Sequence, residues 1–452
     1  MKLKNVNLTE GVIWKQILAF AFPLLLINLM QQLYSIADLM IVGNFSGVDA
    51  MAGIGATTSV INMLIGLALG LATGISVVTV QVNSSEDFDG LYKVVHTGYA
   101  LAIVSGLALT AAGYFLSPAL LQLMGTPLDI LPFSTTYLRI YFLGTLPVTI
   151  YNIGAGILRG VGDTRHPFIF LALGVLLNIA LDFLFVGLFG WGIRGAGWAY
   201  VIAQTVTALL VTLSLTTSMT PFRLFLRDIS FHPAVLVRSL RVGIPAGLQT
   251  FIVAVSNVFV QASINSFGKH AVAGFSAATR TDSFVFVLIS GLALSAMTFT
   301  GANMGVERRE RIKRGLHHSL LLTFILVALL SGLFILLRRQ VAAAFNPDPV
   351  VIGYTARIIV ILLSFYWISA MTEVMGAVLR GMGKAIFPMV ASLICQAGVR
   401  LVWIYAVMPA WPSIDAITLA YPVSWTIHLI AFGIYLRIKG GSMFKETSTD
   451  PI

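Results

Sequence analysis

Charged residues are scarce in this sequence. Only 10% of its 452 residues are Asp, Glu, Lys or Arg, whereas 58% are hydrophobic, and the mean hydropathy is +0.91. A water-soluble protein of this size carries charge at roughly a quarter of its positions. The scarcity of charge therefore excludes a soluble globular protein and indicates an integral membrane protein.

Other absences narrow the class of protein. There is a single cysteine, Cys395, so no intramolecular disulfide is possible, and the seven His have no metal-ligand spacing. The sequence has no Gly-x-x-x-x-Gly-Lys-Ser/Thr loop for nucleotide phosphates and no Gly-x-Ser-x-Gly nucleophile turn. Residues 1–16 lack the short apolar core of a cleavable signal peptide. We expect a retained first helix, no enzyme activity and no cofactor.

What the chain has in abundance is apolar segments long enough to cross a bilayer. We predict an all-α integral membrane protein with about 12 transmembrane helices, separated by Gly, Pro or short charged clusters. The predicted spans are residues 15–42, 52–80, 93–117, 132–156, 167–190, 195–216, 240–266, 272–300, 316–337, 353–377, 387–408 and 415–436.

The basic residues predict an orientation. The formal net charge is +10, and an N-terminus in the cytoplasm puts roughly twenty Lys and Arg inside and about four outside, as the positive-inside rule requires. The charge thus indicates topology and affinity for anionic lipid, and no nucleic-acid partner is expected. We predict a multi-pass protein of the cytoplasmic (inner) cell membrane, monomeric, with both termini in the cytoplasm.

Two parts of the chain repeat each other. Residues 157–167 are ILRGVGDTRHP and residues 378–388 are VLRGMGKAIFP, an offset of about 221 residues that residues 46–56 and 267–277 share. A fixed offset over several segments indicates a duplicated unit. Because each half has an even number of predicted helices, the repeats should be parallel and related by a pseudo-two-fold axis along the membrane normal.

The duplication predicts two six-helix bundles. We expect an N-terminal bundle at residues 1–216, a cytoplasmic linker at 217–239, a C-terminal bundle at 240–440 and a cytoplasmic tail at 441–452. In alternating-access carriers, two such bundles rock around a central cleft. Duplicated halves also occur in channels, so a channel remains the alternative.

Several motifs, taken in order, resemble those of the multidrug and toxic compound extrusion (MATE) family. They are D-x-x-x-V-G at 38–43, L-R-G-x-G-D-T-R-x-P at 158–167, L-N-x-x-L-D at 177–182, G-x-x-G-A-G at 192–197 and G-I-P at 243–245. The resemblance covers essentially the whole chain. It looks closest to the DinF-like branch, because the seventh predicted helix lacks the Glu of the NorM-like branch and carries Asn257 and Gln261 instead.

The resemblance implies a secondary active antiporter that exports organic, often cationic or amphipathic, compounds and drugs in exchange for protons or sodium. Two alternatives stay open, namely a lipid-linked oligosaccharide flippase of the same superfamily and an exporter of a metabolite. A flippase should line its cavity with many more cationic residues than the roughly four intramembrane Arg of this chain.

Polar residues within the predicted spans are the candidate site residues. Asn178 and Asp182 lie four residues apart in an apolar span, hence on one helical face. A carboxylate in hydrocarbon costs roughly 2.5 to 3.5 kcal/mol on insertion scales, so such a residue normally faces a bundle interior or a wet cavity. The alternative is a structural Asp capped by Asn and backbone.

The first predicted helix carries a polar stripe that includes Gln31 and Asp38. The resemblance implies a cation or proton site in the N-terminal bundle made by Asp38, Asn178 and Asp182, with sodium the only metal to consider. Tyr200 stands where the family often has a Thr ligand, which favours protons over sodium. Gln31 and Tyr34 are predicted substrate-binding residues, and a solvated Asp38 near the outer end is the alternative.

In the second half, the candidate substrate-binding residues are Asn257, Asp282 and Arg400. The resemblance suggests that Asp282 contacts a cationic substrate. A structural ion pair among Arg280, Asp282 and Arg400 is the alternative. Glu373, on the tenth predicted helix, either faces the cleft or extends toward the membrane surface.

Overall fold

The computed structural model describes residues 8–46, 48–124, 126 and 128–444, and within these ranges every regular element is helical. Among these residues, eleven helices are long and apolar enough to span a membrane, or twelve if α4 (Leu131–Leu143) and α5 (Thr145–Gly160) form one bent span. The predicted class, all-α with about 12 transmembrane helices, is confirmed.

The span predicted at residues 132–156 is broken. Helices α4 and α5 meet at Gly144 with a bend of 45°. Pro147 follows in the first turn of α5, and a proline ring clashes with the carbonyl four residues earlier, here that of Leu143. The break is therefore a local consequence of the sequence.

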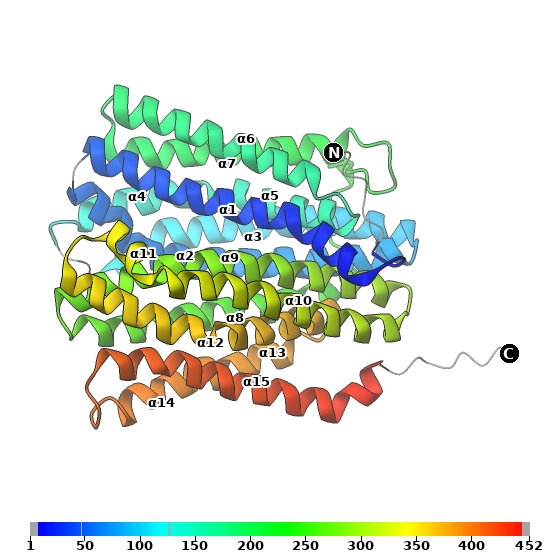
Figure 1. The fold of residues 1–452 in the computed structure, drawn as a ribbon. Helices are drawn as coiled ribbons and strands as arrows, with labels where there is room; N and C mark the ends of the chain where they lie inside the picture. The colour runs from blue at the N-terminus through cyan, green and yellow to red at the C-terminus, as the bar shows by residue number, and fades with distance from the viewer. Residues whose placement is uncertain (1–7, 47, 125, 127, 445–452) are drawn as a thin grey trace. The chain divides into compact units, whose positions relative to one another are not determined.

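The first compact unit is Leu26–Phe251 (Figure 1). Within it α5 packs against α2, α3 and α7, and α6 runs beside α7. Besides α4 and α5, the unit contains the second half of α1 (Ile13–Ser46), α2 (Val48–Ser84), α3 (Phe88–Leu123), α6 (Arg165–Asp182), the π-helix η1 (Phe183–Leu188), α7 (Gly192–Thr216), the short η2 (Leu226–Asp228) and the first half of α8 (Pro233–Asn265).

The second compact unit comprises residues 8–25 and 252–444 of the described part of the chain. Its core is built on α9 and α12, with α10 and α15 packed against α12. The unit contains the first half of α1, the rest of α8, α9 (Lys269–Gly305), α10 (Arg309–Leu336), α11 (Arg338–Phe345), α12 (Pro349–Gly381), α13 (Ile386–Ala391), the π-helix η3 (Ser392–Gly398), α14 (Val399–Ala406) and α15 (Ile414–Phe444).

The repeat found in the sequence recurs in the helix boundaries. Helices α2, α3 and α6 begin at residues 48, 88 and 165, and α9, α10 and α13 begin at residues 269, 309 and 386. Each pair of starting points has the 221-residue offset of the sequence motifs. The duplicated segments therefore adopt the same order of helices, which supports the predicted pseudo-symmetry.

The compact units differ from the sequence halves at two helices, α1 and α8, each of which is divided between the units. The first half of α1 belongs to the second unit, where the Ser295 hydroxyl donates to the Ile17 carbonyl at 2.8 Å. The first half of α8 belongs to the first unit, where a Cβ on Gly70 would lie 2.3 Å from the Gly247 nitrogen. Backbones approach this closely only where both helices have small residues.

Candidate functional site

The first candidate site lies inside the first unit, where α1 and α6 bring Asp38 and Asp182 together. The two carboxyl groups lie close enough to interact electrostatically, and their residues are only 7% and 0% exposed. Asn178, one turn before Asp182 on α6, is 2% exposed. The structure thus assembles three residues that the sequence placed on two separate helices.

Four polar atoms of this site lack hydrogen-bond partners. Both carboxylate oxygens of Asp182 and both side-chain polar atoms of Asn178 are buried and have no hydrogen bond. Two ionised carboxylates cannot bond to each other because both only accept, but a proton on one turns it into a donor. Buried polar groups normally have partners, so these four atoms make the cluster a candidate binding site.

Three tyrosines form a cluster next to this acidic pair. Tyr141 and Tyr200 stack with ring centroids 4.1 Å apart and an interplanar angle of 11°, and Tyr137 lies within electrostatic reach of both carboxylates. All three are buried in one apolar cluster with Ile41 and Val42 and others. Tyr200 was considered from the sequence, but Tyr137 and Tyr141 were missed as site residues. Their spacing of four on one predicted helix was the signal that could have found them.

A change of helix type follows Asp182 directly. Helix α6 ends at Asp182 and the chain continues as the π-helix η1. A π-helical turn widens the helix and shifts the later side chains around its axis, and such turns occur frequently at functional sites. The sequence motif did not predict it.

The donor set permits a proton or a monovalent cation. Among the described residues no group of three or more His, Cys, Asp or Glu could hold a metal ion. Asp38, Asn178 and Asp182 offer carboxylate and amide oxygens, and hard cations take oxygen ligands. A proton needs only one carboxylate oxygen and a neighbouring acceptor, which Asp38 and Asp182 provide for each other.

The second candidate site lies inside the second unit and is centred on Arg400, which is 2% exposed. Its Nε donates to the Ser424 hydroxyl at 3.1 Å and an Nη donates to the Asn257 side-chain oxygen at 3.0 Å. The guanidinium carbon lies 4.2 Å from the ring centre of Tyr421. Of the predicted substrate-binding residues, Asn257 and Arg400 are therefore in contact.

Asp282 lies near this cluster without pairing with it. Its side chain is half-buried, and Tyr366 and Tyr421 are within electrostatic reach of both Asp282 and Arg400. No ion pair links Asp282 with Arg280 or Arg400 within the described residues. The structural ion pair considered from the sequence is not formed.

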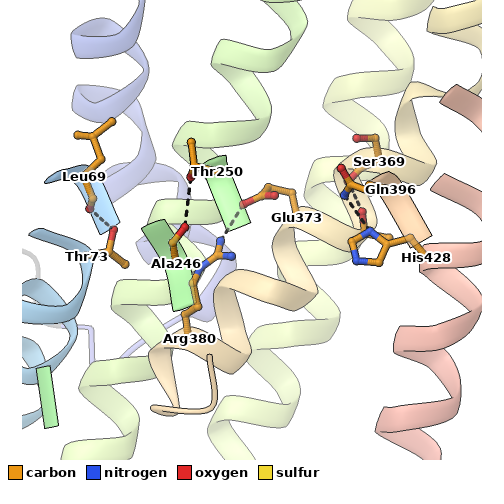
Figure 2. A network of polar contacts seen from close by, with 10 residues as sticks. Leu69, Thr73, Ala246, Thr250, Ser369, Glu373, Arg380, Gln396 and His428 are labelled. Atoms are coloured by element: carbon orange, nitrogen blue, oxygen red, sulfur yellow. Dashed lines mark hydrogen bonds and ion pairs between the residues drawn. The ribbon is translucent and has the colours of Figure 1, made fainter. Parts of the chain in front are cut away.

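Other candidates have different surroundings. Glu373 accepts a hydrogen bond from Arg380 at 2.7 Å on α12 (Figure 2), so it has a local partner on its own helix. Gln396 and His428 approach to 3.0 Å in the same unit. Gln31 is exposed on α1, and the side chain of Tyr34 lies outside the described part of the structure. Their predicted contact with substrate stays a prediction.

Comparison with known proteins identifies the fold. A solved structure described as MATE in complex with MaL6 superposes with a TM-score of 0.90 at 24% identity, covering 97% of this chain and 99% of that one. The chain is 26% identical to a probable multidrug resistance protein, YoeA, of Bacillus subtilis (strain 168), covering 94% of this chain and 93% of the relative. It is 25% identical to a protein of Shewanella oneidensis named FAD transporter, covering 93% of each.

A family model agrees with the internal repeat. The model MatE matches twice, at residues 23–184 and 245–406, once in each half of the sequence. Both matches include the L-R-G-x-G segments, and together they cover most of the chain. Because the family model covers more than half of the chain, the chain belongs to the MATE family of multidrug efflux transporters.

Proposed function

We propose that this protein is a secondary active antiporter that exports organic, often cationic or amphipathic, compounds in exchange for protons. The observation that carries the proposal is the buried pair Asp38 and Asp182 beside Asn178, with four side-chain polar atoms that no hydrogen bond satisfies. Binding of one proton would remove a charge from this site and create a hydrogen bond between the carboxyl groups.

Coupling follows from that change of charge. With both carboxylates ionised, like charges repel across a small apolar site, and when one is neutral the repulsion is replaced by a hydrogen bond. Because the carboxylates sit on α1 and α6, the packing of these two helices changes with protonation. In the cycle, protonation from outside releases the substrate outward, and deprotonation toward the cytoplasm resets the site.

The side chains around the site favour protons over sodium. Sodium would need several oxygen ligands around one ion, and Tyr200, a bulky phenol stacked on Tyr141, is a poor addition to the three side chains available. We also infer, from Asn257 and Gln261, that the protein belongs to the DinF-like branch. We further infer that it is a monomer of the inner membrane with both termini in the cytoplasm.

Transport in proteoliposomes under separately imposed pH and sodium gradients tests the proposal. Export of a cationic dye such as ethidium should follow the pH gradient and ignore the sodium gradient. Dependence on sodium alone would reject proton coupling, and dye movement without either gradient would indicate a channel. Counterflow, in which internal unlabelled dye accelerates uptake of labelled dye, is expected only for a carrier.

A second candidate is export of a physiological metabolite by the same cycle. The Shewanella oneidensis relative is named FAD transporter, so at least one similar protein carries the name of a metabolite transporter. Competition of ethidium export by FAD, compared with an equal concentration of a neutral control, separates the two candidates. Inhibition by FAD would favour the metabolite.

A further inference from the structure

Arg400 is a buried charge without a counter-charge. Its guanidinium is permanently protonated, and the partners it has, Ser424, Asn257 and the ring of Tyr421, are all neutral. No carboxylate of the described residues forms an ion pair with it. Because a buried ion normally requires a partner of opposite charge, this arrangement calls for an anion.

The neutral partners hold the guanidinium for such a ligand. Ser424 accepts from Nε and donates its own proton to the Tyr421 carbonyl at 2.8 Å, which fixes the hydroxyl. The Tyr421 ring packs against the guanidinium at 4.2 Å. One edge of the planar group is therefore anchored by a hydrogen bond and a ring, and a planar fork held in this way suits carboxylate and phosphate oxygens.

Asn257 adds an exposed hydrogen-bond donor, its side-chain amide. Its side-chain oxygen accepts from Arg400 at 3.0 Å, which turns its amide nitrogen away from the guanidinium, and the residue is exposed whereas Arg400 is buried. Amide N–H groups donate to anions. The exposed amide of Asn257 and the buried guanidinium of Arg400 therefore both offer N–H donors to an anion.

Asp282 lies near this cluster but does not pair with Arg400. Asp282 interacts with Tyr366 and Tyr421 but has no direct interaction with Arg400. Asp282 and Arg400 therefore share two tyrosine neighbours without pairing with each other. An unpaired carboxylate and an unpaired guanidinium inside one bundle match a ligand that carries both charges, with its cationic end toward Asp282.

We propose that Arg400, with Asn257 and Ser424, forms a binding site for the anionic group of an organic substrate, a carboxylate or a phosphate. The inference rests on the proposed export of organic compounds and narrows its substrate class. It extends that class from simple cations to zwitterions, whose anionic end binds Arg400.

Binding of a matched pair of dyes to the purified full-length protein tests the proposal. Rhodamine B has a free carboxylate, and its ethyl ester has the same aromatic cation without the acid. Fluorescence polarisation should show tighter binding of the acid to the wild-type protein. In Arg400→Gln the Kd for the acid should rise about tenfold while that for the ester changes less than about twofold, as expected when a charged hydrogen bond is lost.

Two further variants serve as controls. Arg357→Gln removes an exposed arginine of the same unit, which pairs with Asp415 at 3.3 Å, and should leave both dyes unaffected. Arg400→Lys keeps the charge but loses the fork, and should recover part of the acid preference. Asp182→Asn should lose coupled export yet keep the acid preference, so failure of the coupling proposal is distinguished from failure of this one.

Several results would overturn the proposal. The wild type could bind acid and ester equally or bind neither dye. Arg400→Gln could keep the preference for the acid, or it could lose affinity for both dyes equally at an unchanged melting temperature. Competition by phosphatidylglycerol but not by free carboxylates would assign the site to a lipid headgroup and would equally contradict a substrate site.

Discussion

The candidate sites of the two bundles differ in the charge of their central groups, which are carboxylates in the first and a guanidinium in the second. Tyr200 of α7 and Tyr421 of α15 stand at equivalent positions of the repeat, each after an alanine near the start of its helix. In the first unit the tyrosine stacks on Tyr141, which interacts with Asp38, whereas in the second it packs against Arg400. Equivalent tyrosines therefore lie in clusters whose buried charged groups have opposite signs.

Neighbouring positions follow the same division. At the repeat offset, Asn178 and Asp182 correspond to Val399 and Trp403, and the Trp403 indole donates to the Ala416 carbonyl at 2.7 Å. That bond satisfies the polar atom of Trp403, whereas the oxygens of Asp182 have no bond. The buried polar atoms of Asp182 are thus left without a partner, whereas the polar atom at the equivalent position of the second bundle is satisfied by a structural hydrogen bond.

The largest expected effect concerns the acidic site. Asp182→Asn removes the ionisable group but keeps its size, and it should abolish coupled export in membrane vesicles at unchanged protein abundance. Trp403→Phe, at the equivalent position of the second bundle, should retain coupled export because it removes only a structural hydrogen bond. Full transport by Asp182→Asn would break the proposed assignment of coupling to the first bundle.

The next effect concerns helix packing at Gly70 and Gly291, which are also equivalent. A Cβ on Gly70 would lie 2.3 Å from a backbone nitrogen, whereas a Cβ on Gly291 would lie 2.5 Å from the end of the Leu25 side chain, which can move. Gly70→Ala should therefore lower stability by about 1 to 3 kcal/mol and Gly291→Ala by less than about 1 kcal/mol. Thermal unfolding in detergent measures both, and equal losses would contradict the difference in packing.

The L-R-G-x-G repeats provide a third comparison. Arg380 pairs with Glu373, seven residues earlier in the sequence, at 2.7 Å. The equivalent arginine, Arg159, has Asn152 seven residues earlier, and the Nε of Arg159 is buried without a hydrogen bond. Because the Glu373 side chain is 32% exposed, Glu373→Gln should cost about 1 to 2 kcal/mol. A double-mutant cycle with Arg380→Gln measures the coupling. Asn152→Gln is the matched control, with no charge to remove.

The smallest expected effect concerns the ring beneath Arg400. Tyr421→Phe keeps the ring and should change rhodamine B binding little, whereas Tyr421→Leu should weaken it about threefold, as expected for loss of a cation–π contact of about 0.5 to 1 kcal/mol. Tyr200→Leu in the first bundle should leave dye binding unchanged. Equal effects of Tyr421→Phe and Tyr421→Leu would show that the hydroxyl matters more than the ring.

Much of the fold followed from local patterns. The spans, the repeat and the shared face of Asn178 and Asp182 depend on residues close together along the chain or on a simple offset, and the structure bears out the helical class. The break at Gly144 was missed, although Pro147 indicated it. The π-helices η1 and η3 were missed because a widened turn depends on the packing around it.

The sequence by itself determined a membrane protein of duplicated helical segments with a carboxylate in an apolar span. Only the tertiary structure decided that Asp38 reaches Asp182, that tyrosines from α4 and α7 cluster in the same unit, and that Arg400 bonds to Asn257 and Ser424 instead of Asp282. The reason is physical. Helical periodicity specifies which side chains share a face, but contacts between faces depend on the rotation and offset of helices far apart in the chain.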